Sequence, residues 1–149
     1  ACGSWEGKAI EEEEEMKATK KDAVERFEKM YNCCQAVICA YCEELGMKEE
    51  DAFRLTEGFG SGMGGLKDTC GAVTGMFMTI GLKNSAGKMD EPFATKMDTY
   101  QKLLEAAEKF KEKNGSLYCR DLKTEDGPQP LPCCMKCVED AAQIIDEME

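Results

Sequence analysis

The sequence of 149 residues contains no histidine. Without imidazole, Ser-His-Asp and Cys-His catalysis, mixed Cys/His zinc sites and haem attachment through a Cys-x-x-Cys-His motif are all excluded. Any metal must therefore be held by thiolates, carboxylates or backbone groups, and little conventional acid–base chemistry remains.

Positive charge and long apolar runs are also scarce. The chain has 19 Lys and Arg against 30 Asp and Glu, a formal net charge of -11, so it lacks the basic clusters that nucleic acids and anionic membrane surfaces attract. No segment approaches the roughly 20 apolar residues that cross a bilayer, and the opening stretch shows no signal-peptide pattern. We therefore expect a cytoplasmic protein without membrane insertion or nucleic acid, whose protein partner would be basic.

Hydrophobic periodicity predicts an all-α fold, a single-domain helical bundle of five to six helices with a glycine-rich loop. Residues 1–20 are expected to form an acidic, partly helical N-terminal segment, and residues 21–149 a cysteine-rich helical domain. The expected helices cover residues 10–30, 32–45, 49–57, 68–82, 90–114 and 132–149. In the fifth, the apolar face is expected to contain Phe93, Met97, Tyr100, Leu104, Ala107 and Phe110.

The stretch GSGMGGLKDTCGAVTG, residues 60–75, places Cys70 between a glycine-rich loop and a run of small residues. The glycines at 60, 62, 64 and 65 allow positive φ, and Asp68 or Thr69 is expected to cap the following helix. Cys70 would then lie in the first turn, where free N–H groups favour a thiolate. The alternative is a buried cysteine that packs as a small apolar side chain. Gly71 and Gly75 share one helix face, so a second helix is expected to approach closely there.

Six of the ten cysteines lie at expected helix starts. Cys33 and Cys34 open one helix, Cys70 opens another, and Cys133, Cys134 and Cys137 open the last. The Cys-x-x-Cys pairs Cys39/Cys42 and Cys134/Cys137 are weak zinc signatures, because zinc ribbons place such pairs on tight turns. In a reducing compartment, so many cysteines indicate metal binding or thiol redox chemistry.

Several segments together resemble the C_GCAxxG_C_C family of bacterial, redox-active proteins. The matching segments are YNCCQAV (31–37), LTEGFGSGMGG (55–65), TCGAVTG (69–75), SLYCRDL (116–122) and the cysteine of CVEDAAQII (137–145). The resemblance implies that the four family cysteines are Cys33, Cys70, Cys119 and Cys137. Six cysteines go beyond that pattern, and Cys34, Cys133 and Cys134 are candidate additional ligands.

Three functions remain open at this point. The first is an electron carrier, rather than a stand-alone enzyme, that binds an iron–sulfur cluster through Cys33, Cys70, Cys119 and Cys137 and serves a redox protein partner. The second is metal-free thiol–disulfide exchange. The third is Cu(I) or Zn binding by thiolates. Lys67 and Arg120, which flank two of the cysteines, are expected to stabilise negative charge at the site. The oligomeric state is open.

Overall fold

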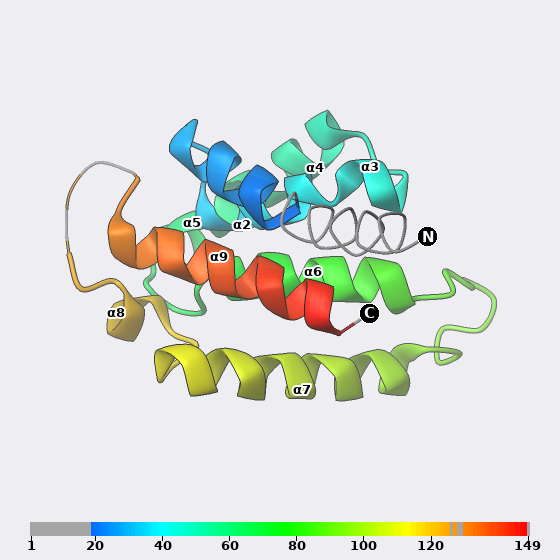
Figure 1. Ribbon diagram of the computed structural model, residues 1–149. Coiled ribbons are helices and arrows are strands. Elements are labelled where there is room, and N and C mark those ends of the chain that lie inside the picture. The colour runs from blue at the N-terminus through cyan, green and yellow to red at the C-terminus, as the bar shows by residue number, and fades with distance from the viewer. Residues whose placement is uncertain (1–18, 126, 128–129, 149) are drawn as a thin grey trace, which may run out of the picture.

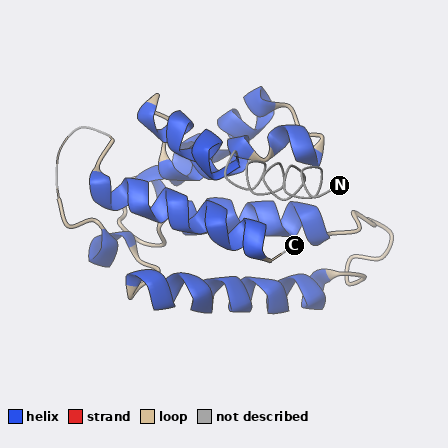
Figure 2. Cartoon of the chain, viewed as in Figure 1, coloured by secondary structure: helices blue, strands red, loops and turns tan. Residues whose placement is uncertain are grey.

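The computed structural model describes residues 19–125, 127 and 130–148, and these residues form an all-α fold (Figures 1 and 2). Across that part of the chain, the only β pairing is an isolated bridge between Thr69 and Tyr118. Residues 19–28 are helical and precede α2 (Cys33–Ala40), α3 (Cys42–Leu45), α4 (Glu49–Thr56), the 3₁₀ turn η1 (Glu57–Phe59), α5 (Gly60–Gly64), α6 (Gly71–Asn84), α7 (Lys96–Asn114), α8 (Cys119–Leu122) and α9 (Pro132–Glu147). The all-α prediction is confirmed, and the short helices α3, α5 and α8 raise the helix number above the one expected.

The acidic segment and the beginning of the first expected helix lie outside the described residues, except for residues 19 and 20. The division of the chain at residue 20 therefore stays a prediction. Among the described helices, none is both long enough and apolar enough to span a membrane.

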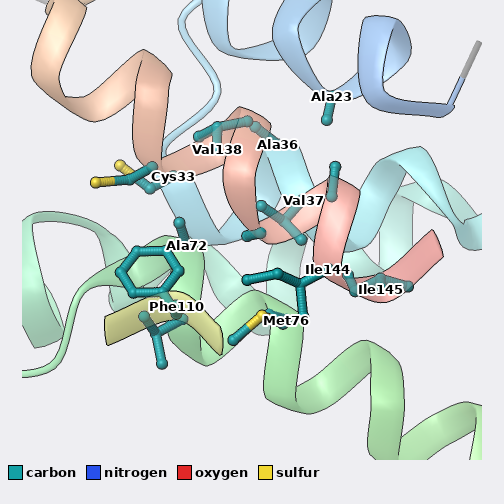
Figure 3. Packing of buried hydrophobic residues seen from close by; sticks show 14 of the residues in the cluster. Ala23, Cys33, Ala36, Val37, Ala72, Met76, Phe110, Val138, Ile144 and Ile145 are labelled. Atoms are coloured by element: carbon teal, nitrogen blue, oxygen red, sulfur yellow. The ribbon is translucent and has the colours of Figure 1, made fainter. Parts of the chain in front are cut away.

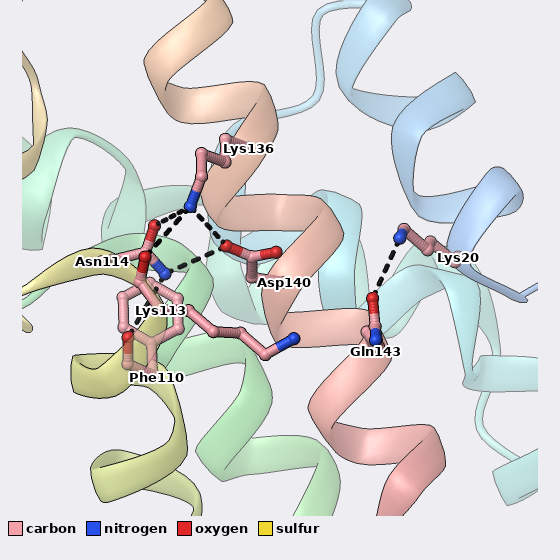
Figure 4. Close-up of polar contacts among 7 residues, drawn as sticks. All are labelled: Lys20, Phe110, Lys113, Asn114, Lys136, Asp140 and Gln143. Carbon is pink, nitrogen blue, oxygen red and sulfur yellow. Dashed lines mark hydrogen bonds and ion pairs between the residues drawn. The ribbon is translucent and has the colours of Figure 1, made fainter.

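Helix α6 lies at the centre of the bundle and contacts α2, α7 and α9 (Figure 1). The core between these helices consists of fully buried side chains that each helix supplies, among them Val37, Met76, Phe110 and Ile144 (Figure 3). A polar contact joins the helix of residues 19–28 to α9, where Lys20 Nζ donates to Gln143 Oε1 at 3.1 Å (Figure 4). Burial of this apolar surface is the main stabilising term of the fold.

Several helix ends follow directly from local sequence. Asn32 caps α2 in a reciprocal arrangement with Gln35, each side chain accepting from the other residue's backbone N–H at 2.9 Å. Gly46 and Gly115 end α3 and α7 in the left-handed region, with φ of 70° and 83°, where glycine has no Cβ to strain. Pro132 occupies the first turn of α9, where its missing N–H costs nothing.

The single helix expected over residues 32–45 is instead broken at Tyr41, so that prediction is wrong. The Tyr41 N–H bonds to the Ile38 carbonyl at 3.0 Å, which tightens the turn. The fully buried tyrosine then points its hydroxyl at α9, 2.8 Å from the Ala142 carbonyl oxygen and 2.9 Å from Asp146 Oδ1. The break thus ties α2 and α3 to the last helix.

Removing the Tyr41 hydroxyl tests how much its hydrogen bonds to α9 stabilise the fold. We expect Tyr41→Phe to lower the free energy of unfolding by about 1–2 kcal/mol, because a buried hydrogen bond to the Ala142 carbonyl and a partly buried one to Asp146 are lost. The matched variant Tyr100→Phe alters a half-exposed tyrosine and is expected to change the same quantity by less than about 0.5 kcal/mol. Urea denaturation followed by circular dichroism measures both, and equal stability of the two variants would contradict the expectation.

Helix α7 differs from expectation in its start and in its buried face. It begins at Lys96 rather than at residue 90, after a turn over residues 92–95. Four residues of the expected apolar face are exposed, with relative accessibilities of 70% (Phe93), 58% (Met97), 51% (Tyr100) and 62% (Leu104). The buried residues of α7 are Ala106 and Phe110, so the helix packs through a different side from the one that most of its large apolar residues occupy.

Candidate functional site: a cavity lined by six cysteines

Six cysteines line one small cavity at the end of the bundle where α2, α6, α8 and α9 all begin. They are Cys33, Cys70, Cys119, Cys133, Cys134 and Cys137, and the lining is completed by Ser61, Gly62, Gly71, Leu122 and Lys123. The volume is about 20 Å³, room for one water-sized group. The structure therefore brings together all four cysteines that the family pattern singles out, with two of the three candidate extra ligands.

The glycine-rich loop adopts an unusual left-handed turn. Ser61, Gly62 and Met63 have φ of 51°, 63° and 69°, and Gly64 and Gly65 continue with 71° and 102°. The expected positive φ is thus confirmed at three glycines, but Gly60 has φ of -73°. Successive left-handed residues are strained for side chains other than glycine, and such strain persists where the surrounding structure enforces it.

Hydrogen bonds hold this loop against the segment that carries Cys119. The Asp68 N–H donates to the Gly62 carbonyl at 3.0 Å, and the Cys119 N–H donates to the Asp68 carbonyl at 2.7 Å. The Cys70 N–H donates to the Leu117 carbonyl at 2.8 Å. These bonds fix Cys70 and Cys119 on neighbouring stretches of backbone although 49 residues separate them in the sequence.

The cap of α6 also differs from expectation. Cys70 itself is the N-cap residue and the helix begins at Gly71, so neither Asp68 nor Thr69 is the cap and Cys70 lies just before the first turn. The pKa of the Cys70 thiol is nevertheless lowered, as expected for a cysteine at the start of a helix. A hydrogen bond from the Cys137 thiol and the N–H groups of Ala72 and Val73 lower the pKa of Cys70, in opposition to burial.

The two glycines of α6 allow α2 to approach closely, as expected. A Cβ at Gly71 would lie 2.9 Å from the Phe59 carbonyl oxygen and 3.1 Å from the Cβ of Cys33. A Cβ at Gly75 would lie 2.9 Å from the Cys34 carbonyl oxygen. The absence of side chains at these positions lets α2 lie close enough for Cys33 to line the cavity with Cys70.

Cys33 and Cys134 form a proton-sharing pair. The Cys33 thiol hydrogen bond, with help from Cys133 and the positive charges of Lys123 and Lys67, lowers the pKa of Cys134 to about 6 in spite of burial. The same hydrogen bond, together with burial, raises the pKa of Cys33. Cys134 is therefore the thiolate of the pair and Cys33 the thiol.

Cys70 and Cys137 form a second pair of the same kind. The hydrogen bond that lowers the pKa of Cys70 raises that of Cys137, which burial and the nearby charge of Asp140 raise further. Cys119 lies outside both pairs, and burial raises its pKa.

Four of the cavity sulfurs thus form two hydrogen-bonded pairs, Cys33 with Cys134 and Cys70 with Cys137, and the sulfurs do not surround one common centre. Across the residues that the structure describes, no three His, Cys, Asp or Glu side chains already have the spacing of a metal site. An ion or cluster bound here therefore requires cysteine side chains to turn about their χ1 bonds toward a common point.

Three other described cysteines lie away from the cavity. Cys34 is fully buried beside α6, and burial raises its pKa to about 12, so the structure does not place this candidate extra ligand with the others. Cys39 and Cys42 belong to a separate small core with Ile38 and Ala52, and burial raises the pKa of both. All nine described cysteines are free thiols.

The positive charges at the site are only partly those expected. Lys67 contributes to lowering the pKa of Cys134, whereas Arg120 lies over the ring of Tyr118 at 4.7 Å. Lys123 takes the role expected of Arg120 and lines the cavity. Its position four residues after Cys119, one helical turn, is the sequence signal that could have identified it.

The pKa of Cys134 gives a direct prediction for the reduced, metal-free protein. A thiolate forms above a lowered pKa, so alkylation of Cys134 by iodoacetamide should reach half its maximal rate near pH 6, whereas an ordinary cysteine does so near pH ~8.5. Peptide mass spectrometry after timed alkylation measures this profile.

The partner thiol supplies the control for that profile. Cys33→Ala removes the donor and should move the midpoint for Cys134 upward, while Cys34→Ala, which removes a buried thiol outside the cavity, should leave it unchanged. If the pH midpoint of Cys134 alkylation were the same in Cys33→Ala as in wild type, the hydrogen bond from Cys33 would not be what lowers the pKa of Cys134.

Comparisons with known proteins identify the family of the chain. Residues 31–148 match the family described as "Putative redox-active protein (C_GCAxxG_C_C)". The chain is also 27% identical over 139 residues to an "Uncharacterized protein" of Archaeoglobus fulgidus, a similarity that covers 89% of this chain and 92% of the relative. No solved structure matches it significantly. The family match extends over most of the sequence and includes every cysteine of the cavity, and the chain therefore belongs to the C_GCAxxG_C_C family.

Proposed function

We propose that this redox protein carries electrons on an iron–sulfur cluster bound by Cys33, Cys70, Cys119 and Cys137. The observation that carries the proposal is the convergence of these four cysteines, from four separate segments, on one cavity. Core packing alone does not require cysteines from four separate segments to line one cavity. The match to a family described as redox-active favours iron over zinc, because zinc has no redox chemistry.

The donor set fits such a cluster. It consists of thiols only, the donors of most cluster sites, and the hydrogen bond from Cys137 lowers the pKa of Cys70. Lys67 and Lys123 supply positive charge that offsets the charge of several thiolates. Gly62 and Gly71 bring bare backbone to the cavity wall, where amide groups can donate to sulfur and tune a potential. When bound, a cluster of this kind supplies one-electron transfer.

The role that follows is that of a carrier and not of an enzyme. The sequence has no histidine, and the described residues that line the cavity include no carboxylate that could act as acid or base. A carrier needs a redox protein partner, and the free thiols of the described residues suit a reducing compartment such as the cytoplasm.

Metal analysis tests the proposal. Protein purified without oxygen should contain iron and acid-labile sulfide in near-equal amounts and absorb in the region of ~400 nm, as thiolate-bound clusters do. Serine at Cys33, Cys70, Cys119 or Cys137 should remove most of the iron, whereas Cys34→Ser and Cys39→Ser, which alter buried cysteines outside the cavity, should retain it. Copper or zinc without sulfide would overturn the proposal and indicate a soft-metal site.

A second candidate, thiol–disulfide exchange, is favoured by the pairing of the sulfurs. Cys133 and Cys134 are the only half-buried cysteines among those described, so they offer the accessible side of the cavity. The Cys134 thiolate would attack a disulfide of a partner protein and release one partner thiolate. Cys33 would then lose its proton, attack the Cys134 sulfur and release the second thiolate, so that two electrons and one proton leave the pair and the partner takes its second proton from solvent.

This alternative has its own signature. Colourless, metal-free, folded protein treated with a mild oxidant should form a Cys33–Cys134 disulfide, which peptide mass spectrometry identifies. If the protein holds iron and sulfide, or if no specific pair oxidises reversibly, the alternative is excluded.

A further inference from the structure

Four large apolar residues at the start of α7 are exposed. Phe93, Met97, Tyr100 and Leu104 are all more than half exposed; the spacing of the last three places them along one side of the helix, and Phe93 lies in the turn just before it. We call these four residues the α7 apolar surface. They account for four of the ten large apolar residues that are exposed in the described part of the chain, a concentration that marks interaction sites more often than chance exposure.

An acidic row borders this surface. Asp98, Glu105 and Glu112 are exposed and recur every seven residues along α7, so Asp98 and Glu105 flank the α7 apolar surface on one side and Glu112 continues the row about two turns beyond Leu104. Glu108 lies between the two rows, near enough to Lys111 for a loose 3.9 Å ion pair. The surface thus combines an apolar stripe with negative charge along one edge.

We propose that the α7 apolar surface docks an amphipathic helix of another protein, one whose apolar face is bordered by Lys or Arg. The apolar face would cover the four exposed side chains, and the basic border would meet Asp98, Glu105 and Glu112. A second copy of this chain is a poorer occupant. It carries the same acidic row and the same net charge of -11, so self-association would oppose like charges.

The position of this surface separates it from the cysteine cavity. The beginning of α7 lies beside the far end of α6, where Asn84 Nδ2 donates to Asp98 Oδ2 at 3.0 Å and to Thr99 Oγ1 at 2.8 Å. The opposite end of α7 contacts the cysteine-bearing half of α9, where Lys136 Nζ donates to Asn114 Oδ1 at 2.7 Å (Figure 4). The described lining of the cavity includes no residue of α7, so the inference does not depend on what the cavity binds.

A designed peptide tests the inference. The probe is a fluorescein-labelled helical peptide of about 18 Leu and Lys residues with its leucines on one face, and the control peptide has the same composition in scrambled order. Fluorescence anisotropy with the full chain should give at least ~10-fold tighter binding for the amphipathic peptide than for the scrambled one. Equal binding of the two peptides would show charge attraction alone and would overturn the proposal.

Variants of the chain locate the contact. M97Q/L104Q should weaken binding at least ~10-fold, and D98N/E105Q/E112Q should weaken it and reduce its dependence on salt. The matched variant E28Q/E43Q/E50Q removes three exposed carboxylates from other helices and should change binding by less than about twofold. Unchanged binding by M97Q/L104Q, or a wild-type dimer that M97Q/L104Q converts to monomer in sedimentation, would overturn the proposal; the second result would assign the surface to self-association.

Discussion

Gly62→Val is expected to lower the free energy of unfolding by about 3 kcal/mol or more and to pull the cysteine cavity apart. Gly62 has φ of +63°, a conformation that costs a residue with a Cβ about 1–2 kcal/mol. The new Cβ would also lie 2.6 Å from the Cβ of Cys119 and 2.7 Å from the Asp68 backbone nitrogen. Neither atom is the far end of a flexible side chain, so the collision adds about 1–3 kcal/mol.

Gly58→Ala is the matched control for this substitution. Gly58 lies four residues earlier in the same glycine-rich stretch, without positive φ, and a Cβ added there would have nothing within 4 Å. We expect its stability to stay within about 0.5 kcal/mol of wild type. Urea denaturation measures both variants, and faster alkylation of Cys119 in Gly62→Val would report the opened cavity. If Gly62→Val were as stable as Gly58→Ala, the left-handed turn would not be needed for the fold.

Phe110→Ala is expected to cost about 3–5 kcal/mol of unfolding free energy, the usual result for a phenylalanine in a packed core. The ring is fully buried between α6, α7 and α9 (Figure 3), and its removal leaves a cavity that rigid helices cannot fill. Phe93→Ala, by contrast, truncates an exposed ring and should change stability by less than about 0.5 kcal/mol. Thermal unfolding of the two variants makes the comparison, and a similar loss in both would mean that Phe93 packs in solution.

The sequence predicts where several helices end, but it does not predict which side of α7 is buried. Helix-ending glycines at 46 and 115 and the proline at 132 act through local backbone chemistry, so their positions were predictable. Periodicity also identifies an apolar stripe on α7, but it does not say whether that stripe faces the core or solvent. The answer depends on which side α6 and α9 occupy, which is a property of the whole chain.

The site was predictable to a different extent. Similarity to a family pattern identified Cys33, Cys70, Cys119 and Cys137, yet spacing alone could not predict that they meet. Their meeting depends on the left-handed turn and on the loop hydrogen bonds, both set by contacts between distant segments. Cys34 was expected to be an additional ligand because it follows Cys33 in the sequence. It does not line the cavity, because one step along α2 turns its side chain away.

The sequence positions of the cavity cysteines bear on the order in which the chain matures. The cavity is lined by thiols from positions 33 to 137, so a growing chain on the ribosome has no complete site until α9 has emerged. Contacts between segments this far apart also form late, because a long loop must close first. We therefore expect the proposed cofactor to be inserted after synthesis, and chains that end before α9 to leave the ribosome with reactive thiols and no cavity to bury them.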